Sequence, residues 1–283
     1  MRNPILATLA PTVAARPFAV SISTARDAVI AANPALAAAG TFLALALIPS
    51  ALALGLDDRL LSGVSVWVKP MKFQASLAVH LLSVAVLLLL LPHAVRRSRQ
   101  VRWIAAAMTA AALGEAAYIT LRAAQAAQSH FASDTTLAIA AYQLMGLGAV
   151  ILVGGAAWIG VLVLRHGEGP APLVLGAGMG LVLGGLLGGV TGFAISAAGG
   201  HWVGGAPSDA GGLPIVGWVR DGGDLRVAHF VGMHLIQGLP AFGLLLWAMS
   251  ARHWRALILG AAALGVLVTL GTYVQAALGR PIW

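Results

Sequence analysis

Cysteine is absent from the 283 residues of this chain. Disulfide bonds, thiolate-bound metals and iron–sulfur clusters are therefore excluded, and the lack of a CxxCH motif argues against covalently attached c-type haem. Charge is also scarce, at 9% of residues, where soluble domains carry about 25%. A folded domain with so few charged residues is not soluble in water, so the composition excludes a soluble protein.

Apolar residues make up 59% of the chain, and its mean hydropathy is +0.90. Seven apolar stretches are long enough to cross about 30 Å of hydrocarbon as helices. They cover residues 35–56, 70–92, 103–127, 137–164, 172–198, 226–250 and 256–278. We therefore expect an all-α integral membrane protein, with residues 35–283 forming a single bundle of about seven transmembrane helices.

Two segments lie outside these stretches. Residues 1–34 contain Pro4 and Pro11, which interrupt a weak apolar run, so an interfacial or disordered leader is favoured over a cleaved signal peptide. Residues 199–225 are rich in glycine and carry Trp202 and Trp218. We expect this loop to fold over the outer end of the bundle, and an unstructured linker is the alternative.

Basic residues gather at the ends of the apolar stretches, most densely as RRSRQVR at residues 96–102. Because cytoplasmic loops carry an excess of basic residues, the N-terminus is expected inside and the C-terminus outside a bacterial inner membrane. The same placement accounts for the net charge of +8 without a nucleic-acid partner. The expected partners are the lipid bilayer, with a quinone, a lipid substrate or another membrane-complex subunit as further candidates.

The fifth apolar stretch has glycines four residues apart at Gly180, Gly184, Gly188 and Gly192. Small residues at this spacing allow helix backbones to approach closely. The pattern predicts a central packing helix and no phosphate-binding loop, since no strand precedes it.

Polar residues recur at helical spacing in three apolar stretches, so each helix is expected to present a polar stripe. The second stretch contributes Lys69, Lys72, Ser76, His80 and Ser83. The third contributes Glu115, Tyr118, Arg122 and Gln125, and the sixth contributes Arg226, His229, Met233, His234 and Gln237. Asp224 precedes the sixth helix, where a carboxylate meets free N–H groups.

Ionisable groups inside a membrane are costly and therefore mark candidate sites. His80, Glu115 and His234 are expected at similar depth, with the cationic residues and His130 nearer the outer surface. We therefore expect a polar pocket that opens outward. Structural roles are the alternatives: His80 bonding a neighbouring helix, the two lysines extending to the membrane surface, and Glu115 pairing with Arg122.

Redox chemistry is the favoured use of this pocket. Haem b needs neutral imidazoles from different helices, and His80 with His229 or His234 would supply them. Cations would then meet the haem propionates, with Lys69, Lys72, Arg122 and Arg226 as candidates. Ser76, Gln125, Asp224 and Gln237 complete the expected ligand-binding set.

A metal-dependent hydrolase acting on a lipid or amphipathic substrate is the second reading. His130, His229 and His234 would bind Zn²⁺, with Glu115 as ligand or base and Tyr118 as a second catalytic residue. The segment SLAVH at 76–80 resembles the Ser-x-x-x-His element of the seven-helix ceramidase and progestin/adipoQ receptor superfamily. This resemblance is partial, because that family's later His-x-x-x-His is absent: His229 and His234 are five residues apart.

A transporter or receptor for an anionic ligand, or an accessory subunit of a membrane complex, is the third reading. It would use Lys69, Lys72, Arg122 and Arg226 as binding charges without chemistry. The segments WVKPMKFQAS, SHF and GDLRVAHFVGMH resemble motifs of an uncharacterised bacterial family of polytopic membrane proteins. That resemblance implies no activity and adds weight only to residues already chosen.

Overall fold

The computed structural model describes residues 22–132 and 135–283, and the remainder of the expected leader, residues 1–21, lies outside them. The expected all-α bundle with seven membrane-spanning helical segments is confirmed. These segments are α2 (Pro34–Leu56), α3 (Val68–Leu87) with the 3-10 turn η1 (Leu88–Leu90), α5 (Arg99–Ala124), α6 (Thr136–His166), α7 (Ala171–Ala197), α8 (Arg226–Met233) with α9 (Leu235–Ala248), and α10 (Trp254–Ala277).

Short polar side chains determine where several of these helices begin. Asn33 accepts a hydrogen bond from the Leu36 N–H at 3.0 Å at the start of α2, where Pro34 is the first helical residue. Ser98 and Thr135 cap α5 and α6 in the same way. These side chains satisfy N–H groups that have no partner inside the helix.

Two shorter helices and two small hairpins complete the described chain. Helix α1 (Ile22–Ala32) lies within the expected leader, and α4 (His93–Arg96) connects η1 to α5. Strands β1 (Leu60–Leu61) and β2 (Val64–Ser65) form one antiparallel hairpin, and β3 (Trp202–Val203) pairs with β4 (Gly223–Asp224) at the two ends of the long loop.

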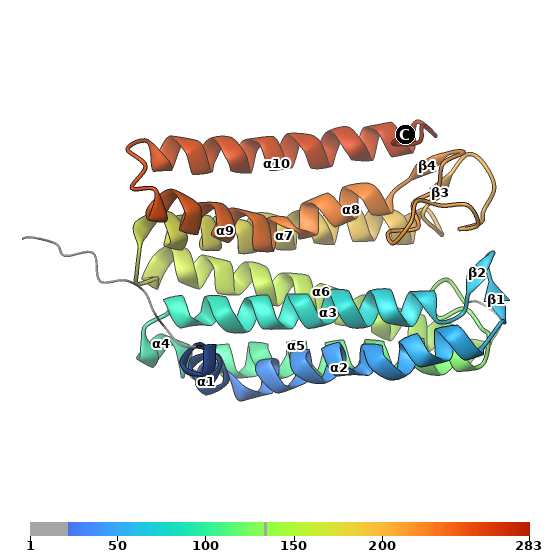
Figure 1. Cartoon of the computed structure of the whole chain (residues 1–283), viewed down its shortest axis with the longest axis horizontal. Helices are drawn as coiled ribbons and strands as arrows, with labels where there is room; N and C mark the ends of the chain where they lie inside the picture. The colour runs from blue at the N-terminus through green and yellow to red at the C-terminus, as the bar shows by residue number, and fades with distance from the viewer. Residues whose placement is uncertain (1–21, 133–134) are drawn as a thin grey trace, which may run out of the picture.

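Figure 1 shows the helices running nearly parallel to one another, with α1 seen end-on across one end of the bundle. That end, here called the basic end, also holds α4 and the arginines of residues 96–102. The opposite end, here called the loop end, holds both hairpins and the C-terminus. The described chain thus begins and finishes at opposite ends, as seven crossings require.

The helices form two groups, α2, α3, α5 and α6 on one side and α7 to α10 on the other. The main hydrophobic core lies within the first group and reaches α7, and it is centred on fully buried side chains such as Leu36, Leu81, Met108 and Ile159. Close packing of α6 on α7 joins the two groups, while α3 approaches α9 over a much shorter length.

The expected packing role of the glycines in α7 is borne out. A Cβ atom on Gly180 would lie 2.5 Å from the Leu235 carbonyl oxygen, and one on Gly184 would lie 2.5 Å from the Ile236 side chain. On the other side of α7, a Cβ atom on Gly185 would lie 2.5 Å from the Val153 carbonyl oxygen of α6. Helix α7 is therefore the element on which both groups of helices pack.

Candidate polar site at the loop end

Arg226 and Asp224 form the centre of a charged cluster at the start of α8. The Arg226 guanidinium donates from Nε to Asp224 Oδ1 at 2.9 Å and from Nη2 to Oδ2 at 2.6 Å. Asp224 is only 3% exposed and also accepts from the backbone N–H groups of Arg226 and Val219. The expected position of Asp224 at the helix start is thus borne out, and its charge is fully compensated.

The long loop adds a second carboxylate to this cluster. Asp209 Oδ1 accepts from Arg226 Nη2 at 2.8 Å and lies 3.1 Å from His201 Nε2. Burial alone would raise the pKa of Asp209, but the hydrogen bond with His201 and the charge of Arg226 outweigh it and lower this pKa from 3.8 to about 2. No sequence pattern indicates either loop residue, because their partners are not neighbours in the sequence.

A turn of the same loop, residues 213–218, lies over the cations and is here called the strap. Lys72 Nζ donates to the Val216 carbonyl at 2.8 Å, and Arg226 Nη2 donates to the next carbonyl, that of Gly217, also at 2.8 Å. Gly217 has a φ of 67°, and a Cβ there would lie 2.6 Å from Lys72 Nζ. The loop therefore folds back onto the helix ends, and it is not an unstructured linker.

Lys69 and Lys72 are the only lysines of the chain. Within residues 22–132 and 135–283, neither has a carboxylate oxygen within 4.0 Å, and Lys69 has no hydrogen bond. Asp209 and Asp224 carry two negative charges against the single positive charge of Arg226, so with both lysines the cluster keeps a net charge of +1.

His130 lies near Lys69 in an aromatic environment. Its ring centroid is 5.3 Å from that of Phe73 and 6.0 Å from that of Tyr142. Burial, together with the positive charge of Lys69, lowers the pKa of His130 to about 3. His130 is therefore a neutral imidazole at physiological pH.

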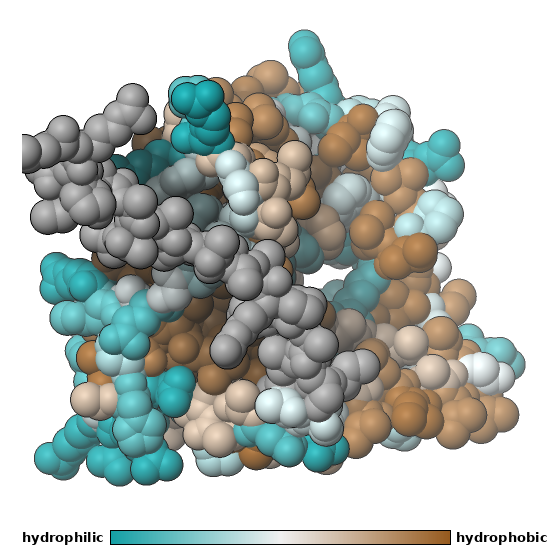
Figure 2. Space-filling view, turned by 60° about the vertical axis from the view of Figure 1, so that its left-hand side comes forward, coloured by the Kyte–Doolittle hydropathy of each residue, from teal (hydrophilic) through white to brown (hydrophobic). Residues whose placement is uncertain are grey.

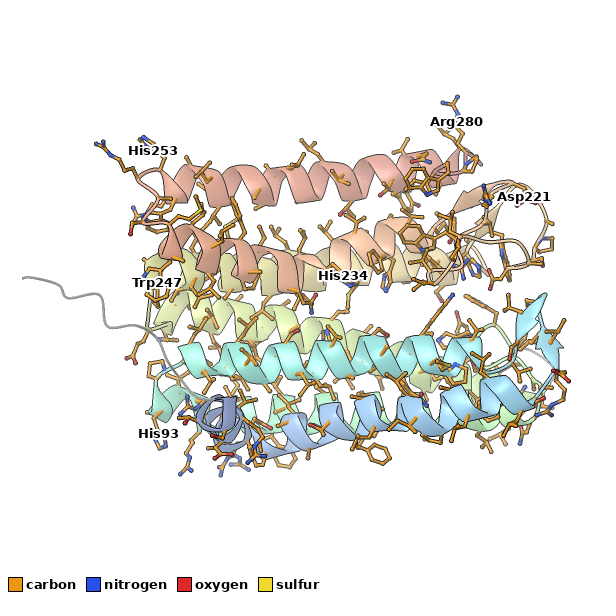
Figure 3. The ribbon with its side chains drawn as sticks, viewed as in Figure 1. His93, Asp221, His234, Trp247, His253 and Arg280 are labelled. Atoms are coloured by element: carbon orange, nitrogen blue, oxygen red, sulfur yellow. The ribbon has the colours of Figure 1, made fainter. Side chains whose placement is uncertain are left out.

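Polar side chains continue from this cluster along the facing sides of α3 and the α8–α9 segment. Ser76 and His234 are exposed although both lie within spans, and Gln237 Nε2 donates to Ser83 Oγ at 3.0 Å between the two helices. Figure 3 shows His234 at the junction of α8 and α9, on their side turned toward α3. In Figure 2 a hollow with hydrophilic side chains at its back opens between hydrophobic surfaces. We call the space between these two polar faces the crevice.

His229 and His234 have matching hydrogen bonds. Thr191 donates its hydroxyl hydrogen to the Leu187 carbonyl at 2.6 Å, so the 3.1 Å contact with His229 Nδ1 requires that this nitrogen carry a proton. His234 Nδ1 lies 2.7 Å from the Phe230 carbonyl and must also be the donor. Both rings thus hold their proton on Nδ1 and leave Nε2 as an acceptor.

His80 and Glu115 face a different neighbour, helix α6. His80 Nε2 donates to the Leu152 carbonyl at 3.3 Å, which is the structural role considered for this residue. Glu115 Oε1 is buried without a hydrogen bond beside Gly148. Among the described residues no ion pair links Glu115 with Arg122, which instead donates to the Gln128 carbonyl at 2.9 Å and to Gln125 Oε1 at 3.4 Å. The alternative in which Glu115 pairs with Arg122 is therefore wrong.

The expected site residues thus do not form a single pocket. Lys69, Lys72, Asp224 and Arg226 meet at the loop end with His130 nearby, and Ser76, His234 and Gln237 line the crevice. Glu115 and His80 pack on α6, and Tyr118 is half-buried on α5. In the part of the chain that the structure describes, no three His, Asp or Glu side chains are grouped to hold a metal ion. No family model, curated protein or solved structure matches this chain.

Proposed function

We propose that the loop end binds an anionic ligand, as a transporter or receptor would, with Lys69 and Lys72 as the binding charges. The observation that carries this proposal is the convergence of both lysines of the chain on one site where the two nearby carboxylates, Asp209 and Asp224, already pair with Arg226. Both lysines lie within the span that begins at Val68, and ionisable groups inside membrane spans are costly and mark candidate ligand sites.

The strap occupies hydrogen-bonding positions that the ligand would take over. The carbonyl groups of Val216 and Gly217 accept from Lys72 and Arg226, as the oxygen atoms of a carboxylate or phosphate would. An anionic oxygen adds the attraction between opposite charges, which a neutral carbonyl oxygen does not offer. An arriving anion therefore displaces the strap from Lys72 and opens the loop toward solvent.

The crevice favours a ligand with an extended, amphipathic body. Below the cations, the exposed polar side chains of Ser76 and His234 alternate with exposed apolar ones such as Val79 and Phe230. A headgroup held by the lysines places the rest of such a molecule between α3 and α8.

Lysine acylation tests this proposal directly, since only Lys69, Lys72 and the N-terminal amine react with an amine-directed reagent. The purified protein is labelled with and without inorganic phosphate, acetate or dodecyl phosphate, and the modified peptides are quantified by mass spectrometry. Dodecyl phosphate is expected to protect Lys69 and Lys72 at lower concentrations than inorganic phosphate, while labelling of the N-terminal amine stays unchanged.

Matched variants separate binding from nonspecific attraction. Lys69→Met and Lys72→Met are each expected to weaken protection of the remaining lysine by about ten-fold, the usual effect of losing one charge-assisted contact. Arg59→Gln is the control, because Arg59 lies at the same end but pairs with Asp57 outside the cluster. Equal protection in all three variants, or none by any anion, would refute the site.

Haem b is the second candidate ligand. It is supported by the tautomer of His229 and His234. In both rings Nδ1 carries the hydrogen and donates it, which leaves Nε2 free to bind a metal, as is usual for histidine ligands. The absorption spectrum of protein purified with added haem separates the two proposals. A Soret band that is lost in His229→Ala but kept in His253→Ala would favour haem over a free anion.

A further inference from the structure

A groove runs along the bundle surface between α5 and α6, away from the polar site. It has a volume of about 520 Å³, and its lining includes Gln100, Trp103, Gly154, Gly155 and Trp158. Both indole side chains are exposed, Trp103 to 66% and Trp158 to 45%. In a membrane-spanning bundle this groove faces the hydrocarbon.

Two adjacent glycines create the groove in different ways. A Cβ atom on Gly155 would lie 2.7 Å from Met108 Sδ, so this glycine allows α6 to pack tightly on α5. A Cβ atom on Gly154 would meet nothing within 4 Å. Gly154 therefore adds nothing to the packing of the helices, and its missing side chain leaves the space open.

Two arginines extend the line of the groove at the basic end. Arg99 lies one turn before Trp103 on nearly the same face of α5, and Arg165 lies two turns beyond Trp158 on the same face of α6. The helices are antiparallel, because Gly155 faces Ile104 and Met108 of α5 whereas Gly148 faces Ala111 and Glu115. Both arginines are exposed, and the helical spacing places them beyond the same end of the groove.

We propose that this groove binds one anionic phospholipid, with its phosphate between Arg99 and Arg165 and an acyl chain along Gly154. Charge complementarity identifies the occupant, since basic pockets between transmembrane helices bind anionic headgroups. The indole rings of Trp103 and Trp158 form the walls, and amphipathic rings of this kind favour the region just below the headgroups.

Native mass spectrometry tests the proposal on the full chain in detergent. Phosphatidylglycerol and phosphatidylcholine with identical acyl chains are added separately, and retained lipid is counted. The protein is expected to retain one phosphatidylglycerol in preference to phosphatidylcholine. Arg99→Gln and Arg165→Gln are each expected to weaken phosphatidylglycerol binding by about five-fold, the effect of one arginine near anionic lipid, without changing phosphatidylcholine binding.

Gly154→Phe fills the groove and is expected to reduce binding of both lipids. Gly146→Phe is the matched control, because Gly146 lies on the same helix, is exposed and also has nothing within 4 Å of a Cβ atom. Arg102→Gln is the control for charge, since Arg102 is exposed on nearly the opposite side of α5 from Gln100. Lipid retention by Gly154→Phe equal to that of Gly146→Phe, or no preference for phosphatidylglycerol, overturns the proposal.

Discussion

Glu115 and His80 meet helix α6 one turn apart. Glu115 Oε1 lies 2.8 Å from the position of a Cβ atom on Gly148, and His80 Nε2 lies 3.3 Å from the Leu152 carbonyl oxygen. Each side chain also keeps one buried polar atom without a hydrogen bond, Glu115 Oε1 and His80 Nδ1. Two helices thus bring incompletely satisfied polar groups to one face of a third.

Replacing Glu115 by glutamine is expected to stabilise the protein. Burying a charged carboxylate is costly, and the amide keeps its shape without its charge. The melting temperature in detergent should therefore rise by a few degrees. Glu168→Gln, which changes the other glutamate of the chain at an exposed position, should leave it unchanged. A lower melting temperature for Glu115→Gln would show that the charge itself is needed.

Gly180→Ala is expected to destabilise the bundle by about 1–3 kcal/mol, the usual cost of overpacking. The added Cβ would lie 2.5 Å from the Leu235 carbonyl, a backbone atom that cannot move without shifting α9. Gly189→Ala on the same helix is the control, because its Cβ would contact only Val153 Cγ2 at 3.5 Å. Thermal unfolding of both variants measures the difference, and equal melting temperatures would contradict the close approach.

Acid is expected to weaken the fold through His130. Its pKa is about 3 in the folded chain and 6.5 in the unfolded chain, so the unfolded chain binds the proton first as the pH falls. Stability is therefore lost progressively below pH 6.5, down toward pH 3, and is unaffected above that range. His130→Phe keeps the aromatic contacts but has no titrating group.

The measurement for His130 is the melting temperature between pH 7 and pH 4. The wild-type protein should lose more stability over this range than His130→Phe. His253→Phe serves as the comparison, because His253 is exposed at the basic end. Parallel pH profiles for the wild type and His130→Phe would contradict the burial of a neutral imidazole.

Ile215→Gly is expected to tighten the strap. Ile215 is 95% exposed and has a φ of 70°, a conformation that costs a β-branched residue about 1–3 kcal/mol and glycine almost nothing. Hydrogen exchange of residues 213–218 and acylation of Lys72 should both slow. Ala210→Gly in the same loop is the control, because Ala210 does not have a positive φ. This substitution should slow neither the hydrogen exchange nor the acylation. Faster exchange in Ile215→Gly would mean that the side chain holds the strap in place.

Hydropathy and helical spacing predicted the spans and the polar faces because both are local properties. The stretch 226–250 was predicted as one helix, and its interruption at His234 was missed because neither proline nor glycine occupies that position. The pairing of Asp209 with Arg226, and of Gln237 with Ser83, depends on how distant segments pack. Spacing shows which face of a helix a residue occupies, but not which neighbouring helix covers that face. For this reason the sequence placed His80 and Glu115 in the outer pocket, although both pack on α6.

The hydrogen bond between Ser83 and Gln237 also marks the inner end of the crevice. Beyond Ser83, α3 continues with apolar residues only, and so does α9 beyond Gln237 as far as Met249. Ser83 lies eleven residues from Lys72, about 16 Å along the helix and thus near the middle of the hydrocarbon. A charged molecule bound at the loop end would therefore face an apolar barrier halfway along the bundle.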